Sequence, residues 1–402
     1  MTGGAAYADL RREPGYLRFL VAATVARTAD EMFAVAAVLH VLDRTGSPAL
    51  AGAVVAGITF PSLVSAPLLG AWLDQRGRRK QLMVIDQAVA VTAVVFIAAC
   101  AGRVPDVAIV AAAVTAGVLW PLSFGGFTSL IPALVRDELL PSANAVEASS
   151  MNLAVIVGPL LAGGISAGFS PAAALYTEAG LTLTALVLIA RLDRVDQPPA
   201  HAGRSLVSVA REGMRLLASV PALRSSTAAG GLQLVGLGFL TLAFPYYCTN
   251  LLGVNRGAAG ALWAAFAVGS TVGAITLARV QRRFRPEHAV AIFLALFGLL
   301  MLTWPLATSL AVALVLVTVS SIPDGPALTA TFAARQEHAP RELQGQIFTT
   351  AAGVKVGAFA LGAALAGPLV VGVGTTGTLL LAAAMQFLGA AVGLLAARGG
   401  GA

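Results

Sequence analysis

The chain has 402 residues, of which 57% are hydrophobic and only 11% are charged. So few charges exclude a water-soluble globular protein of this size. Apolar stretches of about 20 residues recur from end to end, and each is long enough to cross a bilayer. The formal net charge is +7, but the basic residues lie in short loops between apolar stretches. We therefore expect an all-α polytopic membrane protein that sits in the lipid bilayer and binds no nucleic acid.

Twelve membrane spans are predicted along the chain. Lys and Arg gather in one set of the loops between them, whereas the alternate loops hold only Arg44, Arg103 and Arg256. This asymmetry places both termini in the cytoplasm, because cytoplasmic loops carry the excess of basic residues. The predicted spans are 17–42, 48–73, 81–102, 105–130, 143–168, 171–191, 225–251, 257–279, 287–306, 309–333, 345–371 and 375–397.

The longest loop divides the chain into an N-terminal six-helix half (1–191), a cytoplasmic linker (192–224) and a C-terminal six-helix half (225–402). The linker contains Pro198-Pro199, followed by a stretch from Leu206 to Val220 whose apolar residues share one helical face. That pattern predicts an amphipathic helix, which serves either as a structural linker or as a lipid sensor.

The two halves show weak internal similarity. Gly70-Ala71 and the basic residues after it are echoed by Gly273-Ala274, and Gly158 and Gly163 are echoed by Gly362 and Gly367 at a nearly equal offset. Such repeats are typical of transporters built from two pseudo-symmetric six-helix halves.

Glycines and charged residues cluster between the second and third spans. This stretch resembles the signature of the major facilitator superfamily, with Gln75 at the position of its usual first Arg. The residues that carry the resemblance are Gly70, Asp74, Arg76, Gly77, Arg78 and Arg79.

Three further segments are similar to bacterial exporters of the drug and enterobactin efflux branch. They are Val41–Ser47, Leu130–Val135 and the sequence Gly158-Pro159 with Gly163-Gly164, which resembles the superfamily's antiporter motif. The Arg found in the fourth span of many proton-coupled drug exporters is absent here.

The resemblance implies a cytoplasmic gate that closes and opens as the halves rock. Asp74 would face the N-terminus of the eleventh span, where exposed N–H groups favour a negative charge. Arg78 or Arg79 would pair with Asp137 or Glu138. The alternative is that the basic residues only fix the topology.

Ionisable residues inside spans are costly to bury and are therefore functional candidates. In the first span Arg27 is three residues from Asp30 and four from Glu31, so both acids can reach it on one helix. This group is either a self-neutralised structural cluster or a pair of acids of which one carries a proton or meets a cationic substrate. Asp324, flanked by Pro323 and Pro326, and Lys355 are the other candidates.

Some polar and aromatic residues have a second interpretation. We expect Glu178 to be structural, and Asp86 and Glu147 to belong to the gate. Tyr246, Tyr247, Trp120, Trp263 and Trp304 are interpreted as interface anchors or substrate-stacking groups.

These features predict a secondary active transporter rather than an enzyme. The sequence has no phosphate-binding G-x-x-x-x-G-K-[ST] loop, no cysteine framework and no clustered histidines, so we expect no cofactor and no metal. The expected function is proton-coupled export of small amphipathic molecules of the drug or siderophore class. The alternatives are proton symport of a nutrient and a non-transporting membrane sensor. We expect a monomeric protein in a bacterial inner membrane, with a small-molecule substrate and protons as its partners.

Overall fold

The computed structural model describes residues 9–66, 68, 69, 79–123, 127–192, 206–281, 283–339 and 344–397. These residues are almost entirely helical and contain no strand. The helices of the first half are α2 (Tyr16–Thr45), α3 (Pro48–Thr59), α5 (Arg79–Cys100), α6 (Asp106–Leu119), α7 (Phe127–Leu134), α8 (Leu140–Gly168) and α9 (Pro171–Ala190).

The second half begins after α10 (Leu206–Ser219). Its helices are α11 (Pro221–Asn250), α12 (Ala259–Thr276), α13 (Ala278–Gln281), α14 (Pro286–Met301), α15 (Leu310–Ser321), α16 (Asp324–His338) and α17 (Gln344–Ala397). Short 3₁₀ helices lie at Asp137–Leu139, Arg256–Ala258 and Trp304–Leu306.

Each predicted span contains helix, and the all-α membrane fold is confirmed. Within the described ranges, nine helices are long and apolar enough to cross a membrane. One of them runs through α17, which contains the last two predicted spans and turns at Gly374 in the left-handed conformation (φ 74°). The predicted spans 105–130 and 309–333 are each divided into two helices, and the second division falls at Ile322-Pro323.

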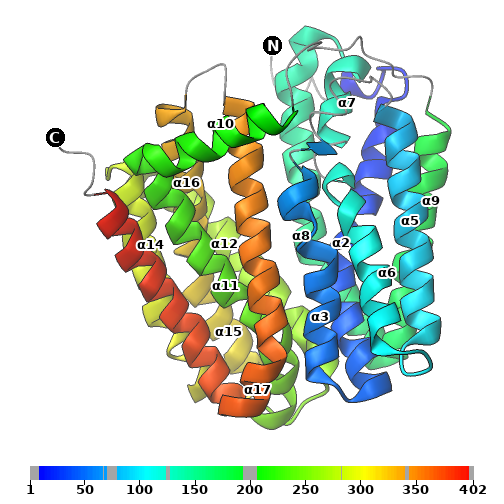
Figure 1. Ribbon diagram of the computed structural model, residues 1–402, viewed down its shortest axis with the longest axis vertical. Coiled ribbons are helices and arrows are strands. Elements are labelled where there is room, and N and C mark those ends of the chain that lie inside the picture. The colour runs from blue at the N-terminus through cyan, green and yellow to red at the C-terminus, as the bar shows by residue number, and fades with distance from the viewer. Residues whose placement is uncertain are drawn as a thin grey trace.

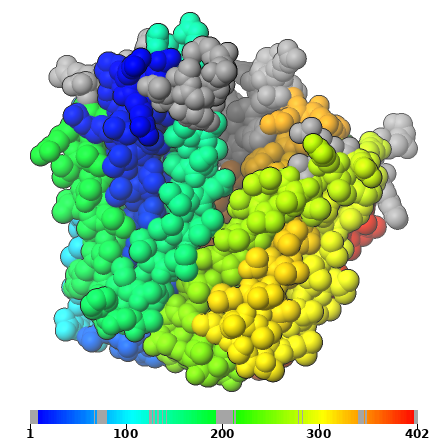
Figure 2. Space-filling view, turned by 180° about the vertical axis from the view of Figure 1, so that it is seen from behind, coloured from blue at the N-terminus to red at the C-terminus, as the bar shows by residue number. Residues whose placement is uncertain are grey.

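The helices form two bundles, seen side by side in Figure 1. Helices α2 to α9 form the N-terminal bundle and α11 to α17 the C-terminal bundle. The start of α2, the end of α17 and α10 lie toward the upper end of the view, which we call the linker end, and we call the other end the far end. The bundles touch through α3 against α17 and α8 against α12. Figure 2 shows the second of these contacts from behind, with teal α8 against yellow-green α12 in the lower part of the molecule.

Local sequence explains the tight connection between α2 and α3. Gly46 ends α2 in the left-handed conformation (φ 65°), which glycine adopts without a side-chain clash. Ser47 then accepts a hydrogen bond from the backbone N–H of Leu50 at 3.2 Å, and Pro48 begins α3. This Ser-Pro start satisfies a free N–H of the first helical turn.

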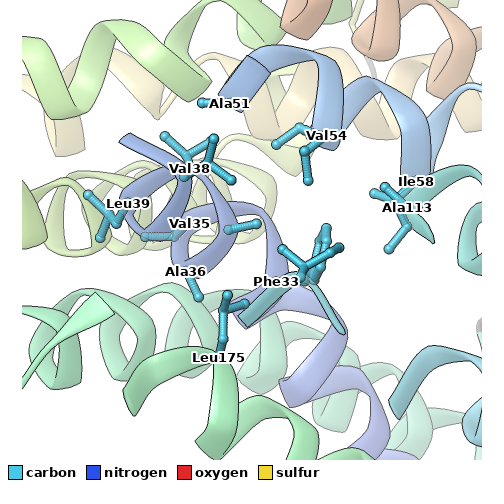
Figure 3. Packing of buried hydrophobic residues seen from close by; sticks show 14 of the residues in the cluster. Phe33, Val35, Ala36, Val38, Leu39, Ala51, Val54, Ile58, Ala113 and Leu175 are labelled. Atoms are coloured by element: carbon cyan, nitrogen blue, oxygen red, sulfur yellow. The ribbon is translucent and has the colours of Figure 1, made fainter. Parts of the chain in front are cut away.

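The N-terminal core forms around α2. Figure 3 shows Val38 of α2 facing Val54 of α3, and Ala36 facing Leu175 of α9; all four residues are buried. Small side chains let the helices approach closely, as is usual in membrane bundles.

The linker region contains the helix α10. Leu217 of α10 is buried with Leu223 and Ile347 in a small core at the linker end, while Met214 is exposed. Leu217 therefore anchors α10 on α11 and α17 of the C-terminal bundle.

Candidate functional site

A cavity of about 200 Å³ lies where the two bundles meet. Its wall on the N-terminal side comes from α2 and α8, and its wall on the C-terminal side from α11, α12 and α17. The lining residues are Glu31, Ala34, Val35, Val38, Val155, Pro159, Thr241, Pro245, Ala259, Trp263, Phe266, Ala267 and Phe359. We call this space the transport cavity. Its lining is apolar and aromatic apart from Glu31 and Thr241.

The aromatic wall of the transport cavity is well ordered by ring contacts. The rings of Trp263 and Phe266 meet edge to face at 6.0 Å, and Trp263 meets Phe244 in the same way at 5.1 Å. Edge-to-face contacts favour this orientation of the rings, and Trp263 and Phe266 both line the cavity. The indole of Trp263 is thus a cavity group and not an interface anchor. By contrast Trp304 and Tyr247 are fully buried in the C-terminal core, where the Tyr247 hydroxyl donates to the Trp304 carbonyl.

The position of Glu31 depends on a close approach between α2 and α8. A Cβ atom on Gly158 would lie 2.6 Å from the Cβ of Glu31 and 3.0 Å from the Met32 nitrogen. Only glycine fits there, so Gly158 lets α2 pack against α8 at the point where Glu31 enters the cavity lining. Pro159, the next residue, lines the cavity itself.

The same motif also joins the two bundles. A side chain on Gly163 would collide with the Gly257 carbonyl and meet the Gly260 Cα at 3.0 Å, and one on Gly260 would collide with the Pro159 carbonyl. We call Pro159, Gly163, Gly257 and Gly260 the glycine seam. Gly164 has open space around it and does not take part.

Arg27 pairs with an acid on another helix, and not with the two acids that its spacing predicts. Its Nη2 lies 2.5 Å from Oε1 of Glu147 on α8, and its Nη1 donates to Ser150 at 3.4 Å. In the part of the chain that is described, Arg27 forms no ion pair with Asp30 or Glu31. The expected sharing of Arg27 by the two acids was therefore wrong. Glu147, which was expected in the gate, lies in this buried pair.

Asp30 and Glu31 point to different places because successive helical residues are turned by about 100°. Glu31 lines the transport cavity, while Asp30 lines a separate small cavity inside the N-terminal bundle. Asp86 and Glu178 line that same small cavity.

Asp324 and Lys355 lie in the C-terminal bundle, outside the cavity lining. Asp324 accepts hydrogen bonds from Ser270 at 2.6 Å and from Gln233. Lys355 interacts electrostatically with Asp324, and its side chain lies beside Gly230. A structural role for this group, tying α11, α12 and α16 together, accounts for its contacts.

Most of the predicted gate lies outside the described residues. These are Gly70, Asp74, Arg76, Gly77 and Arg78. For Arg79 and Asp137 the structure gives the backbone only, at the start of α5 and in the 3₁₀ helix before α8.

Beside these gate positions, Arg136 forms an ion pair with Glu13 at 2.7 Å. The hydrogen bond to this carboxylate raises the pKa of the exposed Arg136. Glu138 belongs to the same 3₁₀ helix as Asp137.

Sequence reasoning did not single out Thr241, Phe266 and Phe359. They are ordinary members of apolar spans, and only the packing of α11, α12 and α17 brings them to one wall. Nothing in their spacing marks them. Within the described ranges, no group of three His, Cys, Asp or Glu side chains has the arrangement of a metal site.

Two helical bundles that enclose a cavity at their interface, with glycines where they touch, define a membrane transporter. The chain belongs to the Major Facilitator Superfamily, whose sequence profile matches residues 19–352.

The relatives are consistent with the drug and enterobactin efflux branch. The chain is 30% identical to an uncharacterized MFS-type transporter y4rN of Sinorhizobium fredii, over 90% of each chain. It is 27% identical to the multidrug efflux pump Tap of Mycolicibacterium fortuitum, over 93% of each chain. It is 26% identical to the enterobactin exporter EntS of Shigella boydii, over 76% of this chain and 70% of EntS.

Solved structures confirm the fold. The nucleoside transporter NupG superimposes with a TM-score of 0.73 at 13% identity, over 94% of this chain and 98% of NupG.

Proposed function

We propose that the protein is a proton-coupled exporter of small amphipathic molecules, of the drug or siderophore class, and that it works by alternating access. The observation that supports this proposal is the transport cavity, with one carboxyl group in an otherwise apolar and aromatic lining. An importer of a polar nutrient would need several hydrogen-bonding groups, and this lining offers only Glu31 and Thr241.

The chemistry of the cavity favours a cationic or neutral amphipathic substrate. Trp263, Phe266 and Phe359 offer apolar and π surfaces, and aromatic faces attract cations as well as flat apolar groups. A carboxylate in such surroundings is a strong partner for a positive charge, because a low local dielectric strengthens the attraction.

Glu31 can couple the flux of protons to the flux of substrate if it binds either a proton or the substrate cation. A proton that arrives from outside would neutralise Glu31 and weaken its hold on the cation, which then leaves outward. Glu31 then releases the proton inward, and its carboxylate is ready for the next substrate. The residue thus acts as the exchange point of an antiporter without any cofactor.

The proposal also covers the orientation of the chain in the membrane and its division into two halves. The start of α2, the end of α17 and α10 lie at the linker end, which we assign to the cytoplasm from the concentration of Lys and Arg in its loops. Residues 1–191 and 225–402 would then rock as two bodies about the linker 192–224, in a bacterial inner membrane. We propose a monomer as the working unit, because the transport cavity is completed by one chain.

The test uses everted vesicles and a fluorescent aromatic cation. A proton gradient should drive accumulation of the cation in vesicles that contain the protein, and Glu31→Gln should reduce the rate by about 10- to 100-fold. That range corresponds to the loss of about 1.5–3 kcal/mol from a charge-assisted contact. Asp106→Asn, which changes an exposed acid at the start of α6, is the matched control and should transport normally. Unchanged proton-driven accumulation by Glu31→Gln would refute the assignment.

A further inference from the structure

Three acidic side chains from three helices converge inside the N-terminal bundle. Asp30 of α2, Asp86 of α5 and Glu178 of α9 line a small cavity of about 20 Å³, together with Ser123. That volume is enough for about one water molecule. Asp86 and Glu178 are each 2% exposed. Asp30 is partly buried as a residue, and its Oδ2 is inaccessible to solvent. We call Asp30, Asp86 and Glu178 the buried acid cluster.

The buried acid cluster is separate from the transport cavity, since the two cavities share no lining residue. They are nevertheless adjacent along the chain, because Asp30 precedes Glu31 and the two carboxyl groups interact electrostatically.

Among the residues that the structure describes, no positive charge lines the small cavity. On α2, Arg27 is held by Glu147, and Glu31 belongs to the transport cavity. On α5, Lys80 lies at the start of the helix and donates to the Leu192 carbonyl. The described parts of α3 and α9 carry no cation, and Asp106 is the one charged residue of α6.

The hydrogen bonds in the cluster leave some acceptor oxygens without a donor. Ser123 donates to Asp86 at 2.8 Å, Gln87 donates to Asp86 at 3.1 Å and to Ser123 at 3.0 Å, and Thr182 donates to Glu178 at 3.1 Å.

Three buried oxygens are left without a hydrogen-bond partner among the described groups: Oδ2 of Asp30, Oε2 of Glu178 and Oε1 of Gln87. Asp30 and Glu178 both line the cavity, so two of these unpartnered oxygens belong to its wall. The site has more acceptors than donors.

Three carboxylates without a counter-ion cannot be stable in this place. Removing each charge from water costs several kcal/mol, and their mutual repulsion adds to this cost. Protons on the carboxyl groups remove the charge and supply the missing O–H donors at the same time. A metal ion would remove the charge too, but the described side chains do not have a metal-site arrangement.

We propose that Asp30, Asp86 and Glu178 form a proton-binding site inside the N-terminal bundle, distinct from the transport cavity and able to exchange protons with Glu31 through Asp30. The binding of protons stands on the cluster alone, whereas its link to transport rests on the proposed function. A change in the packing of α2 against α5 and α9 would change how many protons the site holds.

Infrared difference spectroscopy of the full-length protein in lipid vesicles tests this proposal. At neutral pH the protein should show the carbonyl-stretch band of protonated carboxyl groups. D30N, D86N and E178Q should each remove part of that band, and the triple variant should remove most of it. T182V should shift the Glu178 contribution to higher frequency, because one hydrogen bond to that group is lost. D106N is the control and should leave the band unchanged.

Two results would overturn the proposal. One is a band that the single and triple variants leave intact. The other is a wild-type protein without the band whose unfolding temperature rises with Ca²⁺, Mg²⁺ or Na⁺ alone. If an acid-to-amide variant does not fold, T182V and Ser123→Ala still test the site, since they keep every carboxyl group and should still shift the band. The measurement needs no substrate, so a failure of Glu31→Gln in the transport assay and a failure here are independent results.

Discussion

Replacing Gly158 by Ala is expected to damage the site that holds Glu31. The new Cβ would lie 2.6 Å from the Glu31 Cβ, whereas carbon atoms in contact are normally about 3.5–4.0 Å apart. The helices α2 and α8 must therefore separate by about 1 Å at this point. Such overpacking costs about 1–3 kcal/mol, and the better helix propensity of Ala returns about 1 kcal/mol.

The expected result is a net loss of up to about 2 kcal/mol in the free energy of unfolding, with a severalfold loss of proton-driven transport because Glu31 is displaced. Tryptophan fluorescence during unfolding in detergent measures the first quantity, and uptake of the aromatic cation into everted vesicles measures the second.

Gly164→Ala is the matched control for this variant. It changes a glycine of the same motif whose Cβ would meet nothing within 4 Å, so stability and transport should stay near wild type. The reasoning is refuted if Gly158→Ala behaves as the wild type in both assays, or if Gly164→Ala is equally harmful.

Two other predictions concern the buried ion pair and the orientation of the chain. Arg27→Met should lower the free energy of unfolding by about 3–5 kcal/mol, because Glu147 stays buried without its cation, and the double variant with Glu147→Met should recover most of that loss. Denaturant titration measures both variants, and additive losses would contradict a direct pairing. A fluorescent reporter that matures only in the cytoplasm, fused after the last residue, should be bright, while alkaline phosphatase fused there should be inactive. The reverse pattern would contradict a cytoplasmic linker end.

The architecture was largely predictable from the sequence, because bilayer thickness imposes a length on every span. Less predictable were the interruptions of these spans. The division at Ile322-Pro323 and the turn at Gly374 depend on local backbone geometry, which hydropathy does not detect.

The sequence identified Glu31 and the Gly158–Gly164 motif but not how they combine. Arg27 illustrates the limit. Its spacing from Asp30 and Glu31 favours a local pair, yet its partner Glu147 is 120 positions away, and only the packing of α8 on α2 brings them together. Asp86 and Glu178 are similar, since each looks like an isolated acid until three helices bring them to one cavity.

The glycine seam has a consequence for the thermodynamics of movement. Glycine has no side chain, so closing Gly163 against Gly257 and Gly260 immobilises no rotamers, whereas a longer residue would lose up to about 2 kcal/mol of side-chain entropy. If the bundles rock as proposed, they would meet and part at this point with almost no entropic barrier from side chains. A methyl group added there would hold the two backbones apart, so under the proposed alternating access it would favour the form in which α8 and α12 are separated.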